Sequence, residues 1–212
     1  MKIFIDFDDV VFNTAAFKKE LVKVFLRNGV SQKDFSLTYK DYPTVTRGGL
    51  KKYNPLKQIS VLKRKLKISD SKIKKDLDKL LASSPKFVFR DVKSFLARFR
   101  EKDLFLISYG ETGFQRSKIV NCGLKRFFNK IIITDNLKST EIGKIVKRGG
   151  ERFVFIDDRT TQIDAVKKKF PQAVTFFVKR KTGRFRDKRS KCVDYEVKNL
   201  REVAEIITGI ES

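Results

Sequence analysis

Apolar and polar positions follow two different patterns along the chain. From Pro85 onward, short apolar runs that favour β-strands alternate with stretches in which apolar residues recur at helical spacing. The expected strands are LFLIS (104–108), KIIIT (130–134), FVFID (153–157) and AVTFFV (173–178), and the expected helices cover 91–102, 114–128, 139–150, 160–170 and 199–210. This alternation predicts an α/β fold with a doubly wound, Rossmann-like parallel sheet.

The N-terminal run KIFIDF (2–7) is a further β-favouring segment, and the chain after it changes character. Between Asn13 and Ser84 the apolar residues recur three or four positions apart, which indicates helices, and Ser69 is a candidate cap for the last of them. The first strand is expected to join the later sheet. We therefore predict a core formed by residues 1–12 and 86–212, interrupted by a helical insertion over 13–85.

Length and composition are sufficient for one substantial core, or for one core with a smaller appended module. The 212 residues are 41% hydrophobic and 12% aromatic, which is enough apolar surface to exclude a disordered chain. No apolar run approaches the ~20 residues needed to cross a bilayer. The first strand is too short and too acidic for a signal peptide. The expectation is a cytoplasmic protein without a membrane partner.

The side chains that are missing restrict the chemistry. The sequence contains no histidine, which excludes serine–histidine and cysteine–histidine catalysis and histidine-ligated zinc. Its two cysteines, Cys122 and Cys192, form no disulfide framework or thiolate metal motif. Any catalysis must use carboxylates, lysines, hydroxyls, backbone amides and a hard metal ion.

Reactive polar residues stand where the predicted strands end. They are Asp6 and Asp8 after the first strand, Ser108 at the end of LFLIS, Lys138 after KIIIT, and Asp157 and Asp158 at the end of FVFID. In open parallel sheets, ligands bind beyond the carboxyl ends of the strands, so these side chains should meet at one rim. Clustered carboxylates repel unless a cation lies between them, and hard oxygen ligands favour Mg²⁺.

These residues resemble the motifs of the haloacid dehalogenase-like (HAD) hydrolase superfamily, in the same order and over nearly the whole chain. The first motif, D-x-D-x-[TV], corresponds to Asp6-Phe7-Asp8-Asp9-Val10, with Asp9 where glycine is common. Ser108 matches the second motif, Lys138 the third, and the acidic pair in FVFIDDR the fourth. The resemblance implies that the helical insertion is a cap, which closes over small substrates.

The resemblance also implies catalytic roles. Asp6 would attack phosphorus to give an aspartyl-phosphate, and Asp8 would protonate the leaving oxygen and then activate water. Ser108 and Lys138 would bind the transferring phosphoryl group, although Lys118 or Lys144 could take the place of Lys138.

The same resemblance implies a magnesium site. The carboxylate of Asp6, the backbone carbonyl of Asp8 and an acid of the fourth motif would hold the ion. Alignment with members that carry G-D-x-x-x-D favours Asp158 as the direct ligand, with Asp157 behind it, and the reverse assignment stays open.

Within the superfamily that the chain resembles, an acid at the position of Asp8 distinguishes phosphoryl transfer from dehalogenation, because an alkoxide leaving group needs a proton and a halide does not. The sequence therefore predicts a Mg²⁺-dependent phosphatase for a small phosphorylated metabolite or nucleotide. The alternatives are a phosphomutase, and a nucleic-acid-binding or polynucleotide-end phosphatase.

Charge keeps the nucleic-acid alternative open. The formal net charge is +24, from 49 Lys and Arg against 25 Asp and Glu. This charge indicates a polyanionic partner, or a compositional bias without a ligand. The segment 179–191 carries eight basic residues and one acid, Asp187, and it should follow a strand whose end lies at the catalytic rim. It either contacts a polyanion or forms a solvated loop without a ligand. Arg47, Lys51 and Lys52 in the insertion are candidates for substrate contact or for the surface. The sequence does not indicate the oligomeric state.

Overall fold

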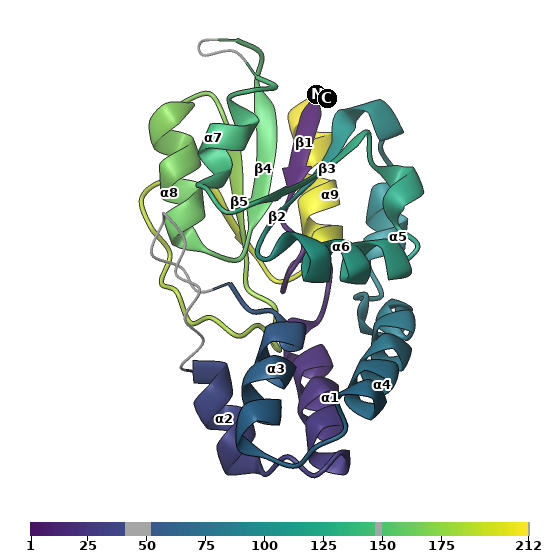
Figure 1. The fold of residues 1–212 in the computed structure, drawn as a ribbon. Helices are drawn as coiled ribbons and strands as arrows, with labels where there is room; N and C mark the ends of the chain where they lie inside the picture. The colour runs from purple at the N-terminus through teal and green to yellow at the C-terminus, as the bar shows by residue number, and fades with distance from the viewer. Residues whose placement is uncertain (41–51, 147–149, 212) are drawn as a thin grey trace.

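The computed structural model describes residues 1–40, 52–146 and 150–211, and a parallel sheet forms the centre of this described part (Figure 1). Its six strands lie in the order β3-β2-β1-β4-β5-β6, and every neighbouring pair is parallel. They are β1 (Lys2–Ile5), β2 (Leu104–Tyr109), β3 (Lys130–Thr134), β4 (Phe153–Asp157), β5 (Val174–Val178) and β6 (Tyr195–Val197). The predicted doubly wound fold is confirmed.

The strands of the sheet differ from the sequence-based expectation at two points. β1 ends at Ile5 rather than Phe7, because the chain turns immediately after Asp6, whose backbone N–H still donates to the carbonyl of Ile156 at 2.9 Å. β6 was not expected. It is only three residues long with Glu196 at its centre, so no apolar run marks it, and it forms by pairing with β5.

Helices cover both faces of the sheet. Successive side chains of a strand point to opposite faces, so the apolar side chains on each face need a layer of helices to bury them. Within β1, Phe4 faces one apolar cluster, together with residues of α7 (Lys138–Ile142) and α8 (Thr160–Lys169). Ile3 and Ile5 face the other cluster, together with residues of α5 (Val92–Leu96), α6 (Thr112–Asn121) and α9 (Leu200–Glu211). Three of these helices are shorter than predicted, since α5, α6 and α7 end at Leu96, Asn121 and Ile142.

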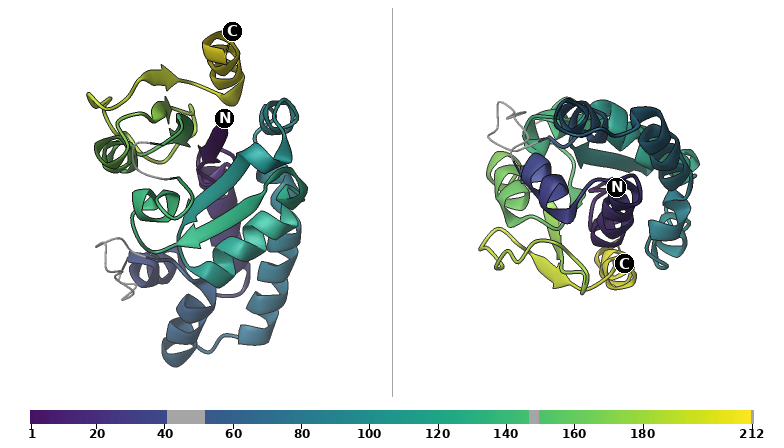
Figure 2. Two further views of the ribbon diagram at one scale, coloured as in Figure 1. Left: turned by 90° about the horizontal axis from the view of Figure 1, so that it is seen from above. Right: turned by 60° about the horizontal axis from the view of Figure 1, so that its bottom comes forward.

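The insertion forms a group of helices beyond the carboxyl ends of the strands, and its buried apolar residues belong to the same cluster as Ile3 and Ile5 (Figures 1 and 2). Its described part contains α1 (Thr14–Arg27), α2 (Gln32–Lys40), α3 (Pro55–Lys65) and α4 (Asp70–Ala82). The predicted cap residue Ser69 accepts the backbone N–H of Lys72. Of the basic residues proposed for substrate contact, Arg47 and Lys51 lie outside the described residues. Lys52 pairs instead with Asp135, 2.6 Å away, and so links the insertion to the core.

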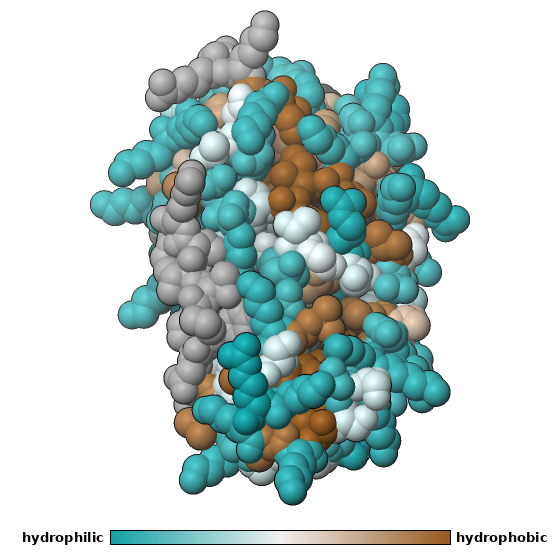
Figure 3. Space-filling model, in the orientation of Figure 1, coloured by the Kyte–Doolittle hydropathy of each residue, from teal (hydrophilic) through white to brown (hydrophobic). Residues whose placement is uncertain are grey.

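The surface reflects the composition of the chain. On the face drawn in Figure 3, hydrophilic residues surround smaller apolar areas. Among the helices of the described residues, none is both long and apolar enough to cross a membrane.

Candidate active site

Three acidic side chains converge where β1 and β4 end. Asp6 follows β1, Asp157 is the last residue of β4, the strand paired with β1, and Asp158 follows it. A carboxylate oxygen from each lies within 4.8 Å of the others, and all three residues are buried. The pairing of β1 with β4 therefore brings together acids that lie about 150 positions apart in the sequence.

Lys138, the first residue of α7, lies between two of these acids. Its Nζ donates to Oδ2 of Asp157 at 2.7 Å and to Oδ1 of Asp6, and its side chain is 3% exposed. Burial alone would lower the pKa of this ammonium group, but Asp157 and Asp6 outweigh burial and hold the pKa above its usual range. Gln162 of α8 fixes the start of α7 by accepting the backbone N–H of Lys138 at 3.2 Å.

Lys144 and Lys118, the two alternatives to Lys138, lie elsewhere. Lys144 pairs with Glu141 one turn away and is largely exposed, so it takes no part in the site. Lys118 is buried but contacts Asp8 rather than Asp6. Lys138 is therefore the lysine that the fold places on the predicted nucleophile.

Asp158 differs from its two neighbours because nothing in the described part of the chain donates to its carboxylate, although the residue is only 8% exposed. Burial, with Asp6 and Asp157 close by, raises the pKa of Asp158 to about 9. Asp157, in contrast, accepts from Lys138 and from the backbone N–H of Arg159 at 2.8 Å. A buried, unpartnered carboxylate beside other hard oxygen donors fits Mg²⁺, with Asp158 and Asp6 as the groups that would hold it.

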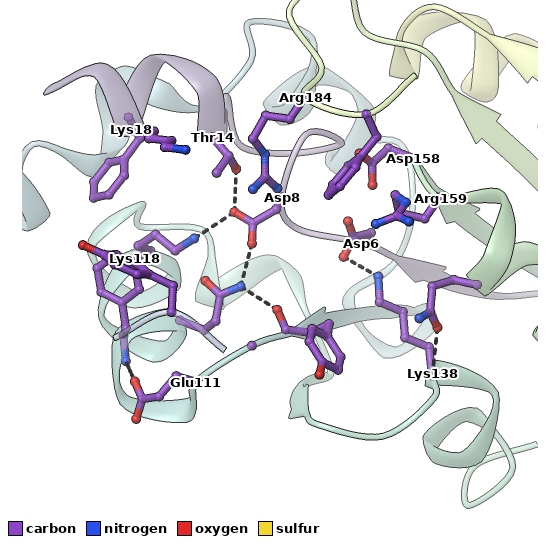
Figure 4. A pocket seen from close by; sticks show the side chains of 18 of the residues that line it. Asp6, Asp8, Thr14, Lys18, Glu111, Lys118, Lys138, Asp158, Arg159 and Arg184 are labelled. Atoms are coloured by element: carbon purple, nitrogen blue, oxygen red, sulfur yellow. Dashed lines mark hydrogen bonds and ion pairs between the residues drawn. The ribbon is translucent and has the colours of Figure 1, made fainter. Parts of the chain in front are cut away.

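Asp8 lies apart from this cluster and is held as a carboxylate by three donors (Figure 4). The Thr14 hydroxyl donates to Oδ1 at 2.5 Å, the Gln115 amide to Oδ2 at 2.6 Å, and the Lys118 ammonium to Oδ1 at 2.8 Å. Burial would raise the pKa of Asp8, but Lys118 and Arg184 reverse that effect and keep the pKa well below its usual range. The side chain of Asp8 is thus not among the clustered acids, and only its backbone carbonyl is left for the predicted metal contact.

Ser108 sits beneath the cavity wall rather than in it. It is fully buried, and its Oγ accepts from the Gln115 amide at 3.0 Å. The same amide donates to the carbonyl of Tyr109 at 2.9 Å. The next residue, Gly110, has φ +153°, and a Cβ there would come within 2.7 Å of the Gln115 side chain. Glycine at this position therefore leaves room for the side chain that holds Asp8.

The basic segment 179–191 does reach the catalytic rim. Nε of Arg184 lies 2.5 Å from Oδ2 of Asp9, the residue that replaces the common glycine of the first motif. Asp9 is the one non-glycine residue of the described chain with positive φ, at 59°, a conformation that aspartate tolerates better than most residues. Other basic residues of the segment bind within the fold, such as Arg180, whose Nη1 lies 2.8 Å from Asp91.

A cavity of about 360 Å³ opens between the rim and the helical insertion. Its rim side contains Asp6, Asp8, Lys138, Asp158 and Arg184, and its other walls carry the aromatic residues Phe17, Tyr39, Tyr53, Tyr109, Phe114 and Phe185. Its volume is in the range of small-molecule sites.

Sequence reasoning missed two of the residues that hold Asp8. Thr14 is the first residue of α1, six positions after Asp8. Gln115 lies three positions before Lys118 on α6, so the side chains of Gln115 and Lys118 lie on the same side of that helix. The available signal was that Thr14 and Gln115 lie in the first turns of the helices that follow the Asp8 turn and the Ser108 strand, close to the rim.

Comparison with known proteins identifies the fold. No protein-family model matches the sequence, and no curated protein does. Among solved structures, a protein assigned as a haloacid dehalogenase-like hydrolase from Burkholderia xenovorans LB400 superposes with a TM-score of 0.75 at 17% identity, covering 98% of this chain and 96% of that one.

Two further structures have the same architecture. The HAD-hydrolase YfnB of Bacillus subtilis, solved bound to magnesium, has a TM-score of 0.63 at 14% identity and 98% coverage of both chains. The L-2-haloacid dehalogenase of Xanthobacter autotrophicus has a TM-score of 0.61 at 11% identity, also with 98% coverage of both. The chain has the fold of the HAD-like hydrolases, as its motifs predicted.

Proposed function

We propose that this protein is a Mg²⁺-dependent phosphatase that hydrolyses phosphate monoesters through an aspartyl-phosphate on Asp6. The observation that carries the proposal is the contact of Asp6 with Lys138 beside the unpartnered carboxylate of Asp158. This arrangement offers a nucleophile, a fixed positive charge and a cation site at one rim. The magnesium-bound neighbour YfnB supports the choice of metal.

In the first step, an Asp6 oxygen forms a bond to phosphorus while the bond from phosphorus to the leaving oxygen breaks. Asp8 supplies the proton that the leaving oxygen takes up. Lys138 offsets negative charge on the transferring group and on Asp6. When bound, Mg²⁺ would neutralise the clustered carboxylates and the phosphoryl oxygens.

In the second step, Asp8 as a carboxylate takes a proton from water, which attacks phosphorus and releases Asp6 and inorganic phosphate. The contacts of Asp8 support this role, because Lys118 and Arg184 hold its pKa low and so keep its side chain ionised. In the first step Asp8 must instead be protonated, so its ion pair with Lys118 has to open when substrate binds.

Asp8 also distinguishes this proposal from dehalogenation, the activity of the Xanthobacter neighbour. A halide leaves without a proton, so dehalogenation gives no task to an acid two residues after the nucleophile. Transfer to a second substrate hydroxyl, as in a phosphomutase, would use the same residues and differ only in the acceptor.

The test is a panel of phosphate esters and one 2-haloacid, assayed for released phosphate and halide with Mg²⁺ and with EDTA. We expect Mg²⁺-dependent phosphate release by the wild-type protein and none by Asp6→Asn, whose folded structure is checked by circular dichroism. Halide release, or undiminished phosphate release by Asp6→Asn, would overturn the proposal.

A further inference from the structure

One phenylalanine of this chain stands out by its exposure. The sequence has 20 phenylalanines, and all of them except Phe185 are buried or half-buried. Phe185 is 39% exposed and lies in the basic segment between β5 and β6, at the wall of the active-site cavity. An exposed apolar ring at the wall of a cavity indicates a contact with a ligand, whereas single exposed apolar residues elsewhere on a surface are common and need no explanation.

The ring is held in place rather than left on a loose loop. The guanidinium of Arg159 lies over it, 3.8 Å from the ring centroid, and that of Arg184 lies 5.1 Å away. Asp187 accepts from Nε of Arg159 at 3.0 Å and from the backbone N–H of Thr160 at 3.2 Å. The segment is thereby fastened to the start of α8, and the pair of Arg184 with Asp9 fastens it to the turn after β1.

These contacts place an aromatic ring and two cations beside the chemical centre. Arg159 directly follows Asp158, and Phe185, Arg159 and Arg184 line the same cavity as Asp6. A ligand whose phosphate contacts Asp6 would thus have the exposed part of the Phe185 ring and two guanidinium groups within the same cavity. Guanidinium groups bind phosphate and also stack on planar rings.

We propose that the substrate is a phosphate monoester of a nucleoside, whose base stacks on Phe185 between Arg159 and Arg184. This inference rests on the proposed phosphatase function and names its substrate class. Stacking on an aromatic side chain suits any base, because every base has a π-face. A sugar phosphate offers hydroxyl groups instead, which need hydrogen-bond partners that a phenylalanine ring does not have.

The test measures binding separately from turnover. Asp6→Asn protein with Mg²⁺ is titrated by calorimetry with a nucleoside monophosphate, a short 5′-phosphorylated oligonucleotide and a hexose phosphate. The same titrations are repeated with Phe185→Leu added. Phe127→Leu is the matched control, since Phe127 also lies beside a guanidinium, that of Arg126 at 5.1 Å, but outside the cavity.

We expect the nucleotide ligands to bind more tightly than the hexose phosphate. Phe185→Leu should weaken nucleotide binding about ten-fold, as base stacking contacts do, and leave hexose phosphate binding within about two-fold. The control should change neither. The relative affinity for the mononucleotide and the oligonucleotide then shows whether the substrate is a free nucleotide or the end of a polynucleotide.

Tighter binding of the hexose phosphate, or an equal effect of Phe185→Leu on all ligands, would overturn the inference. The two proposals fail differently. If nucleotides bind through Phe185 but no ester is hydrolysed by the wild-type protein, the phosphatase function fails and the binding site stands. If esters are hydrolysed without this preference, only the substrate class fails.

Discussion

Asp158→Asn should make the metal-free protein more stable at pH 8, although it removes a residue of the proposed active site. Burial and the neighbouring acids raise the pKa of Asp158 in the folded protein to about 9, from 3.8 for an ordinary aspartate. A carboxyl whose folded-state pKa is raised contributes stability that is fully present below pH 3.8. That contribution is lost as the pH rises towards 9, because the unfolded chain ionises freely and the folded one does not. Asparagine has no such dependence on pH.

The size of the stability difference follows from the width of the pH range between the two pKa values of Asp158, in the unfolded and in the folded protein. Each pH unit within this range lowers the free energy of unfolding by about 1.4 kcal/mol for one such group. From pH 4 to pH 8 the upper limit is about 5 kcal/mol. Local relaxation and water reduce the effect of burial, so we expect Asp158→Asn to gain about 2 to 4 kcal/mol over the wild type at pH 8, and almost nothing at pH 4.

Urea unfolding of both proteins in EDTA, from pH 4 to pH 8, measures this difference. Comparing the two proteins cancels most of the effect of the high net charge, and Asp78→Asn, a change at an exposed position of α4, controls for the lost negative charge. Mg²⁺ should then stabilise the wild type at pH 8 and have little effect on Asp158→Asn. Parallel curves for wild type and variant, or a less stable variant at pH 8, would refute the reasoning.

Three further changes test other parts of the site. Lys138→Met leaves two buried carboxylates without their cation and should lower the free energy of unfolding at pH 8 by about 3 to 5 kcal/mol. Lys144→Met, at an exposed ion pair, should change it by less than about 1 kcal/mol in the same urea titrations. Asp8→Asn should lower kcat/KM for alkyl phosphates by about 10² to 10⁴-fold. The loss of kcat/KM should be far smaller for nitrophenyl phosphate, whose leaving group needs no proton, because kcat/KM reports the first step and not the later attack of water; equal losses would argue against an acid role. Asp9→Ala should be about 1 kcal/mol less stable than Asp9→Gly, because both lose the contact with Arg184 but only alanine is strained at φ 59°.

Most of the sheet could be predicted from sequence because β1, β2, β4 and β5 are apolar runs that are buried on both faces. The same property explains why the strand-end residues were found, since Asp6, Ser108 and Asp157 interrupt such runs. β6 and the early end of α7 at Ile142 escaped because neither has a periodic pattern of its own. These elements depend on packing against the rest of the fold.

The contacts within the site were less accessible to sequence reasoning. The sequence around each lysine does not indicate that Lys138 contacts Asp6 and that Lys118 contacts Asp8. Each contact depends on how the helix that carries the lysine, α7 or α6, lies over the rim. Whether Asp158, the favoured choice, or Asp157 would be the direct metal ligand was open for the same reason. The structure separates them through hydrogen bonds, since Asp157 accepts from Lys138 and Arg159 whereas Asp158 lines the cavity.

A phosphoryl group on Asp6 is the central claim, and trapping it is the most direct test. Protein turning over a phosphate ester with Mg²⁺ is quenched in acid within milliseconds, reduced with borohydride, digested and analysed by mass spectrometry. Reduction of an aspartyl-phosphate gives homoserine, which marks the residue. The account predicts homoserine at position 6, only with both substrate and Mg²⁺ present, and none in Asp6→Asn. Turnover with an unmodified Asp6, or homoserine at another position, would contradict it.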